Sequence, residues 1–437
     1  MVFKGMELLM NIIHFNTEES GGAGEAAYRL HNNLQKYGHQ SLMLVQRKTS
    51  NEKSIIEINN KIIDTAHKFL NKFEDSLIYF DQKYAFFNKG REVITDYRDL
   101  VKVIPFKPDA IVLNWISGFV SLNAIKDLQD YYKVPVFWHL MDMAPMTGGC
   151  HYAWDCEGYK NSCENCPATL NKAKKQLVRK IFQNKKEIIS KMDLSILTGS
   201  YWTMEQVKNS TLFKNKEKKY FPVPIDENIF KQLNKMEIKK KYKIPLDKKV
   251  IYFAASNIFD KRKGYPYLVE ALKILSKSTK ISNFIIVIAG NNVEADIILK
   301  NLEIEHINIG YLNGNNALAE GYNLADLYLS PSIQDSGPMM VNESLMCGVP
   351  VIAFEMGVAV GLIKNGIHGY LAKLEDSNAF AKCILKFFEH NESEIKEMGK
   401  NCRKLALETN SYTKQIQIFQ KIIDETTLSY KGDLCLK

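Results

Sequence analysis

The sequence predicts an α/β protein built from two Rossmann-like domains, each of about 200 residues. Three observations carry this prediction. The chain has 437 residues, which is long for a single domain. Residues 11–45 have the pattern strand, glycine-rich loop, helix and strand, which is a βαβ unit. A second apolar strand at residues 249–255 opens another such series.

The composition is typical of a soluble globular protein. No uninterrupted apolar run reaches the roughly 20 residues that a membrane span needs. The first residues contain a lysine and apolar side chains but no small-residue cleavage site. We therefore expect an extension that runs into the first strand, not a signal peptide, and a cytoplasmic protein.

The net charge is +9, and much of the excess lies in residues 171–191, which hold eight basic residues and one acid. Apolar residues recur there at roughly helical spacing, so the segment predicts a basic amphipathic helix. Its basic face is either an ordinary solvated face or a contact with an anionic membrane surface. Nucleic acid is not expected as a partner, because no aromatic-rich basic groove accompanies the charge.

Glycines follow the first strand. Gly22 and Gly24 stand in the pattern G-x-G-x-x-A, before a helix expected over residues 26–37, and so match a dinucleotide fingerprint formally. The acid expected at the end of the second strand is absent, because residues 46–48 are Gln-Arg-Lys. This absence argues against NAD. A plain tight turn is the alternative.

Two buried strands of the first half end in polar residues. Residues 110–115 end with Asn114 and Trp115, and residues 134–139 end with His139. Ligands bind at the carboxyl ends of strands in open α/β sheets. His139 is therefore either a ligand contact or a hydrogen-bonded core residue. Residues 51–105 show no periodicity that indicates a function.

Four of the eight cysteines lie within seventeen residues: Cys150, Cys156, Cys163 and Cys166. The spacing C-x5-C-x6-C-x2-C supplies four soft ligands, enough to close a tetrahedral structural zinc site. In a reducing compartment we expect these cysteines to form a metal site and not disulfides. His151 is a substitute ligand.

Three adjacent cations, Lys261, Arg262 and Lys263, follow the strand at residues 249–255 and precede a predicted helix. A cationic loop at the carboxyl end of a strand and the start of a helix is well placed to bind phosphates. A solvated loop is the alternative.

Residues 330–354 predict a loop, a short helix and a buried strand. Ser336 or Gly337 can cap the helix, and Pro338 suits its first turn. Glu343 shares a helix face with apolar residues, where a carboxylate costs free energy unless it is hydrogen-bonded. Asp335 lies eight residues earlier, in the loop that faces the helix N-terminus, a site that favours anions.

The pair Asp335 and Glu343 resembles the E-x7-E signature of retaining GT-B glycosyltransferases of family 4, also called glycosyltransferase group 1. The first acid is Asp here instead of Glu. The cysteine segment, residues 143–167, resembles one found in a subgroup that includes enzymes of capsule and colanic-acid-type polysaccharide synthesis. The resemblance covers most of residues 11–425.

This resemblance implies the GT-B fold, two Rossmann-like domains facing across a cleft. We expect an acceptor-side domain over residues 1–228 with a cysteine-rich insertion at 143–167. A nucleotide-sugar-binding domain is expected over residues 229–410. A helix and tail, residues 411–437, should return to the first domain.

The resemblance also implies an activity: transfer of a sugar, with retention, from a nucleotide-sugar donor to a glycan or lipid-linked acceptor in surface polysaccharide synthesis. No cofactor is expected for catalysis, and a structural zinc would brace the acceptor-side loop. The implied catalytic residues are His139, Asp335, Arg262 and Lys263. The implied donor-binding residues are Gly22, Gly24, Tyr311, Gly337, Pro338, Met339 and Glu343.

In this scheme Glu343 binds the ribose, Asp335 positions the sugar, and Arg262 with Lys263 neutralises the leaving diphosphate. Peripheral contact with the inner face of the membrane is expected. Two alternatives stay open: a related GT-B enzyme such as a nucleotide-sugar epimerase, and a non-catalytic GT-B scaffold. Two departures from the family pattern support the scaffold alternative. Asp335 replaces the usual Glu, and Ile258 stands where the family commonly has arginine.

Overall fold

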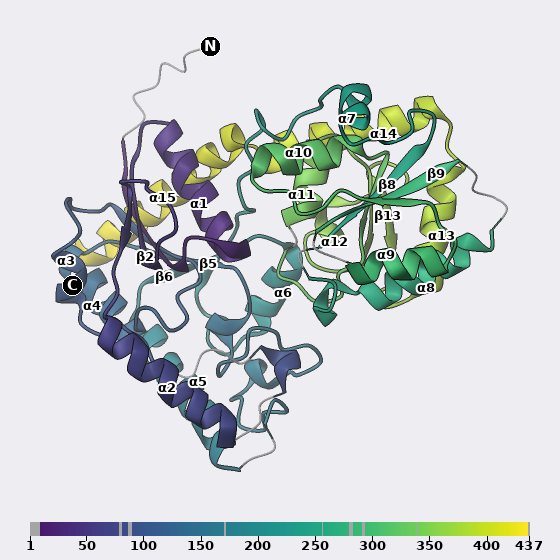
Figure 1. The fold of residues 1–437 in the computed structure, drawn as a ribbon. Coiled ribbons are helices and arrows are strands. Elements are labelled where there is room, and N and C mark those ends of the chain that lie inside the picture. The colour runs from purple at the N-terminus through teal and green to yellow at the C-terminus, as the bar shows by residue number, and fades with distance from the viewer. Residues whose placement is uncertain are drawn as a thin grey trace. The chain divides into compact units, whose positions relative to one another are not determined.

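The computed structural model describes residues 9–77, 81–85, 90–169, 172–255, 257–278, 283–290, 293–337 and 339–435. The chain divides into two compact units, each an open parallel sheet with helices packed on it (Figure 1). Unit 1 comprises Met1–Gly199, Thr203–Pro224 and Gln415–Lys437, and unit 2 comprises Ser200–Trp202 and Ile225–Lys414. The predicted fold class of two Rossmann-like domains is confirmed. The chain leaves unit 1 after Pro224, close to the residue 228 that the sequence suggested.

The sheet of unit 1 is entirely parallel across the described strands. In sheet order these are β3 (Ile55–Glu57), β2 (Gln40–Arg47), β1 (Asn11–Glu18), β4 (Ala110–Leu113), β5 (Val136–Leu140), β6 (Leu194–Thr198) and β7 (Glu217–Tyr220). Parallel strands that are covered on both faces carry apolar runs, as β2 and β4 do; β1 and β5 are equally buried, although each includes a histidine.

The helices of unit 1 are α1 (Gly21–Lys36), α2 (Lys61–Leu77), α3 (Tyr97–Val101), α4 (Leu122–Tyr132), α5 (Lys172–Lys191), α6 (Tyr201–Asn209, whose first two residues group with unit 2) and α15 (Tyr412–Cys435). Short 3-10 turns lie at η1 (Gln82–Tyr84), η2 (Ala144–Met146) and η3 (Gly158–Lys160).

Two hydrophobic layers cover the sheet of unit 1. One layer joins the strands to α4 and α5. The other joins them to α1 and α15, where the Phe419 ring lies 6.3 Å from Phe137 and 5.4 Å from Phe221 between centroids. As the sequence predicted, the C-terminal helix packs on the first domain.

Unit 2 has a second parallel sheet. In sheet order its described strands are β10 (His306–Asn308), β9 (Phe284–Ala289), β8 (Lys249–Ala254), β11 (Leu327–Ser330), β12 (Val351–Phe354) and β13 (Gly369–Ala372). The helical segments are α7 (Lys235–Lys241), η4 (Lys261–Lys263), α8 (Tyr265–Ser276), α9 (Val293–Asn301), α10 (Asn315–Leu324), α11 (Met339–Met346), α12 (Ala359–Leu362), α13 (Ser377–Phe388) and α14 (Glu392–Thr409).

Both sheets reverse their strand order at one point. In unit 1 the first strand lies between β2 and β4, and in unit 2 the first strand, β8, lies between β9 and β11. Ligands of doubly wound sheets bind outside the carboxyl ends of the strands at this switch point. The loops that leave β8 and β11 therefore mark the candidate site of unit 2.

Candidate functional site

The loops after β8 and β11 are joined by their backbones. The amide of Ile333 donates to the carbonyl of Arg262 at 2.8 Å. Gly264, with φ of +64°, ends the first loop, and a Cβ atom there would stand only 1.8 Å from the carbonyl oxygen of Pro331. Only glycine has both the backbone conformation and the missing side chain that this approach needs. The switch point of unit 2 is thus closely packed.

An ion pair spans these two loops. Lys263 Nζ lies 2.9 Å from Asp335 Oδ2, and both side chains are largely buried, 27% and 16% exposed. The amide of Gly337 donates to Asp335 Oδ1 at 3.2 Å. Burial alone would raise the pKa of Asp335, but the charge and hydrogen bond of Lys263, with Arg262 and the Gly337 amide, hold it below its usual value. The sequence-predicted acid and cation therefore form one charged pair.

Arg262 is held by an acid that the sequence analysis missed. Asp260 accepts from the Arg262 amide at 3.1 Å and from Arg262 Nη2 at 2.5 Å. Its position, two residues before Arg262 at the start of a turn, could have indicated this contact from the sequence. Ile258, at the position of the family's common arginine, is buried (4% exposed), so the nearby guanidinium comes from Arg262 instead.

Glu343 on α11 is buried (3% exposed) inside a group of tyrosines. The Tyr322 hydroxyl donates to Glu343 Oε2 at 2.7 Å, and the rings of Tyr252 and Tyr328 each lie 5.6 Å from the Tyr322 ring. Burial and the neighbouring carboxylate raise the pKa of Tyr322, so the phenol stays a donor. This hydrogen bond offsets the cost of an acid on an apolar face. The sequence analysis did not predict these tyrosines. A buried tyrosine hydroxyl needs a hydrogen-bond partner, and this need could have indicated a contact with Glu343.

The start of α11 lies directly beyond the Asp335 loop. Met339 is its first residue, and Gly337 precedes it by two positions. The amides at a helix start carry partial positive charge, which favours an anion. Pro338 lies outside the described residues. Tyr311, beyond β10, presents a ring that is 63% exposed.

The predicted residues of unit 1 have different surroundings. Gly22 and Gly24 lie in the first turn of α1, which begins at Gly21, five residues before the expected start. A Cβ atom at Gly24 would lie 2.4 Å from the carbonyl oxygen of Glu19, whereas one at Gly22 would meet nothing within 4 Å. Close packing requires the glycine at Gly24, and open space surrounds Gly22.

His139 on β5 is fully buried. Its Nε2 donates to the carbonyl oxygen of Phe221 at 3.1 Å, and burial lowers its pKa to about 4. The imidazole is therefore neutral near pH 7. This environment favours the hydrogen-bonded core histidine, the alternative to a sugar contact.

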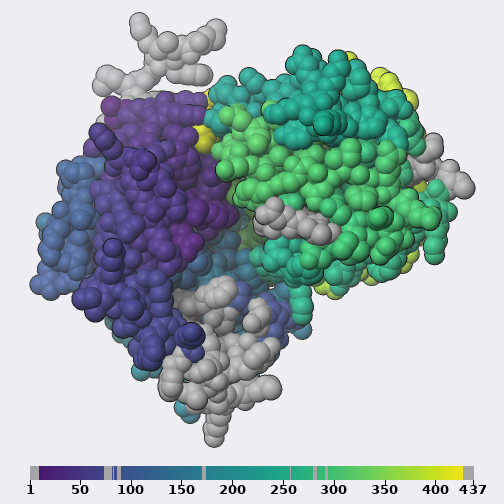
Figure 2. All heavy atoms as spheres, viewed as in Figure 1, coloured from purple at the N-terminus to yellow at the C-terminus, as the bar shows by residue number. Residues whose placement is uncertain are grey.

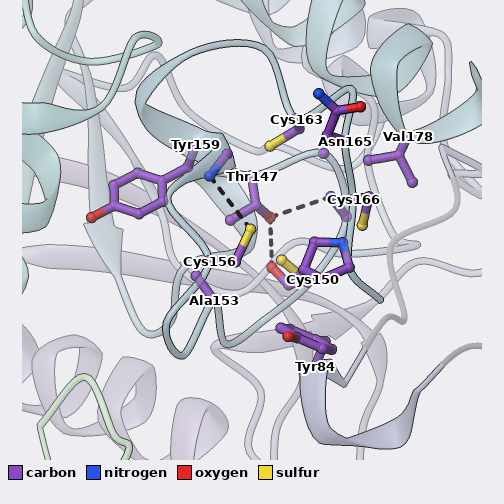
Figure 3. Close-up of a pocket in the computed structure, with 14 residues that line it drawn as sticks. Tyr84, Thr147, Cys150, Ala153, Cys156, Tyr159, Cys163, Asn165, Cys166 and Val178 are labelled. Carbon is purple, nitrogen blue, oxygen red and sulfur yellow. Dashed lines mark hydrogen bonds between the residues drawn. The ribbon is translucent and has the colours of Figure 1, made fainter. Parts of the chain in front are cut away.

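The four clustered cysteines line one small cavity of about 20 Å³ in unit 1 (Figure 3). The cavity has room for an ion or one water molecule and is too small for a sugar. All four are free thiols. Among the described residues no three His, Cys, Asp or Glu side chains already stand in an arrangement that could hold a metal ion. His151 instead pairs with Asp142, Nδ1 to Oδ2 at 2.5 Å.

The basic helix expected at residues 171–191 is α5. Its apolar side is buried, with Val178, Phe182 and Ile189 each 1% exposed, so this side packs in unit 1. Arg179, Lys180, Lys186 and Lys191 are exposed, whereas Lys174 and Lys185 are buried, so the helix is an ordinary packed helix with a partly solvated basic face. Within the described segments no helix combines the length and apolar character of a membrane span.

Part of the chain is similar to a known family. Residues 234–405, which include β8, β11 and α11, match the family described as "Glycosyl transferases group 1". An uncharacterized 41.2 kDa protein of the Klebsiella pneumoniae cps region is 28% identical over 254 residues, 56% of this chain and 66% of that protein. The Escherichia coli UDP-Gal:alpha-D-GlcNAc-diphosphoundecaprenol alpha-1,3-galactosyltransferase is 24% identical over 180 residues, 39% of this chain and 44% of that enzyme.

The matches therefore span about half to two thirds of these curated relatives. Among solved structures, sucrose-phosphate synthase from Thermosynechococcus elongatus superposes with a TM-score of 0.65 at 15% identity. This match covers 98% of this chain and 100% of that one. At this identity the likeness concerns the fold, which is the predicted GT-B class of two Rossmann-like domains.

Proposed function

We propose that this chain transfers a sugar from a nucleoside diphosphate sugar to a glycan or lipid-linked acceptor, because its residues 234–405 match the glycosyltransferase group 1 family. The transfer would serve surface polysaccharide synthesis, as the cps-region relative suggests. The observation that carries the proposal is the ion pair between Lys263 and Asp335, which joins the two loops at the switch point of unit 2. Both loops lie within residues 234–405, the segment that matches the family.

The chemistry follows from charge. Departure of a nucleoside diphosphate leaves negative charge that must be stabilised in the transition state. Lys263, Arg262 and the start of α11 supply positive charge at one place, so the chain's own groups perform this role. Asp335 neutralises Lys263 before donor binds and holds its ammonium in position, which limits the reorganisation needed when a diphosphate arrives.

Glu343 takes the ribose diol in this proposal. Tyr322 fixes its Oε2, which orients the carboxylate on α11. A hydrogen bond to a charged group contributes about 1.5–3 kcal/mol. Loss of the bond between Glu343 and the ribose should therefore raise the donor dissociation constant about 10- to 150-fold. Retention of the anomeric configuration belongs to the same proposal, and NMR of the product tests it.

The first test is a thermal-shift panel with UDP-, GDP-, ADP- and dTDP-sugars without added metal. We expect one nucleotide class to raise the melting temperature, and UDP-sugars come first because the related E. coli enzyme is named for UDP-Gal. Glu343→Gln keeps an acceptor for Tyr322 and should lose most of the shift. Glu355→Gln, an exposed acid after β12, is the matched control and should keep it.

No shift with any donor would contradict the proposed donor site. A full shift in Glu343→Gln would contradict the ribose assignment alone. Product analysis separates transfer to an acceptor from epimerisation of the donor, and a protein that binds donor without turnover would be a scaffold.

The membrane contact of this proposal belongs to α2. Ile62 and Phe69, seven residues apart and so on one helical face, are 83% and 71% exposed, and the neighbouring Leu70 is 44% exposed. Residues 61–72, dark blue, lie at the surface in Figure 2. Exposed lysines accompany this apolar stripe at Lys61, Lys68 and Lys72. An apolar stripe among lysines is complementary to an anionic bilayer surface.

Vesicle co-sedimentation tests this contact. The full chain should bind vesicles that contain anionic lipid more tightly than neutral ones, and salt should weaken the binding. Ile62→Ser with Phe69→Ser should weaken it about tenfold or more, because two apolar side chains no longer enter the interface. Ile297→Ser, an equally apolar and 55% exposed position on α9, should bind normally. Equal binding of all variants would refute the role of α2 without touching the donor site.

A further inference from the structure

The cysteine cavity of unit 1 has no part in the proposed transfer, yet it gathers four soft ligands. Cys150, Cys156, Cys163 and Cys166 all line it, together with glycines and apolar side chains (Figure 3). Their shared location requires an explanation.

We propose that Cys150, Cys156, Cys163 and Cys166 form a tetrathiolate site for a structural zinc ion. Thiolates are the ligands that closed, four-coordinate zinc sites favour. The cavity, about 20 Å³, matches an ion and excludes larger ligands. The thiols as described do not form a metal-binding arrangement, so binding of the ion would require the cysteine side chains to adopt other rotamers.

The backbone leaves room for the ion. A Cβ atom at Gly158 would lie 3.4 Å from Cys156 Sγ and 3.7 Å from Cys163 Sγ, so a larger residue would enter the space between these sulfurs. A Cβ atom at Gly148 would instead clash with Val178 Cγ1 at 2.5 Å, so close packing against α5 requires that glycine. Cys163 itself has φ of +53°, a tight turn at the start of the C-x2-C pair. Tight turns bring both thiols of such a pair toward one point.

A hydrogen-bond donor already points at one of the sulfurs. The amide of Gly158 donates to Cys156 Sγ at 3.4 Å. Donors of this kind orient ligating groups and disperse the charge of thiolates.

A buried cation lies beside the cluster. Lys185 is 8% exposed, and its ammonium donates to the carbonyl oxygens of Ala144 at 2.7 Å and Thr147 at 3.1 Å. Thr147 lines the cavity, and its hydroxyl donates to the Cys150 carbonyl oxygen at 2.5 Å. Zinc with four thiolates carries two net negative charges, which this cation partly balances. The site would hold together residues 150–166, which include η3, while Lys185 links α5 to the carbonyl of Ala144 in η2.

Metal analysis of the full chain, purified without chelator, tests the proposal. We expect about one zinc per chain by mass spectrometry of the metal. Cys156→Ser with Cys166→Ser should remove it, and Cys383→Ser, a partly buried thiol in unit 2, should leave it. A chelator should lower the melting temperature of the parent chain and not that of the double variant.

Because the double variant could fail to fold, Co²⁺ exchange into the parent chain gives a second readout. Charge-transfer absorption from thiolate to cobalt is expected, with d–d bands of the tetrahedral intensity. Absence of zinc together with four alkylatable thiols, or with disulfides found by peptide mass spectrometry, would overturn the proposal. Neither result bears on donor binding by unit 2.

Discussion

Acid should destabilise unit 1 through its buried histidines. His139 and His31 are buried, and burial lowers the pKa of each from 6.5 to about 4. His14, close to both, has its pKa lowered further by burial and by these two neighbours. The unfolded chain binds a proton at each site below pH 6.5, and the folded chain does not until about pH 4. Stability is therefore fully present above pH 6.5 and is lost as the pH falls toward 4.

The magnitude follows from the His139 shift. A folded pKa of about 4 against 6.5 unfolded corresponds to a loss of about 2 kcal/mol at pH 5 relative to pH 8, and about 3.4 kcal/mol below pH 4. Between these pH values the slope approaches about 1.4 kcal/mol per pH unit for this one residue. A loss of this size is a large fraction of the stability of an ordinary domain.

Urea unfolding at pH 5, 6, 7 and 8 measures the effect. Tryptophan fluorescence reports mainly on unit 1, because Trp115, Trp138 and Trp154 belong to it and only Trp202 belongs to unit 2. His139→Gln keeps an N–H donor for the Phe221 carbonyl and cannot titrate. We expect this variant to lose about 2 kcal/mol less than the parent between pH 8 and pH 5. An identical pH dependence in both chains would refute the assignment of a depressed pKa to His139.

Two further substitutions test the local geometry of unit 2. Gly310→Ala places a side chain at φ of +75° in open space and should lower the melting temperature by about 2–4 °C, whereas Gly264→Ala adds a clash with Pro331 and should lower it more than twice as far. Equal shifts in calorimetry would show that the two loops do not pack as described. Asn391→Ala removes the capping box of α14, in which Asn391 and Glu394 satisfy each other's amides, and should cost about 1 kcal/mol in urea unfolding. A cost below about 0.3 kcal/mol would contradict this capping role.

The charged loops were predictable because local pattern determines them. Apolar runs followed by glycines, acids or cations indicate where strands end, and parallel strands present those ends on one edge. The sequence therefore predicted that Lys263 and Asp335 serve the same edge. It could not predict their 2.9 Å contact, because the pairing of β8 with β11 joins residues more than seventy positions apart.

The surroundings of buried polar groups were not predictable in the same way. The carbonyl of Phe221 that binds His139 and the phenol of Tyr322 that binds Glu343 come from other elements of their units. The exposed stripe on α2 was missed for a different reason. Its apolar residues do recur at helical spacing, but that spacing alone does not show that the apolar side faces water and not the core.

The return of α15 to the sheet of unit 1 has a consequence for biosynthesis. A ribosome that has completed residue 224 has made every strand of that sheet, but the surface that receives Phe419 is still bare. At about 5–20 residues per second, the segment through Ile423 takes on the order of 10–40 s more to appear. During that interval the nascent first domain exposes Phe137 and Phe221 to solvent, which makes it a substrate for chaperones. A fragment that stops at residue 224 would keep that exposed surface permanently, so it should aggregate when expressed alone.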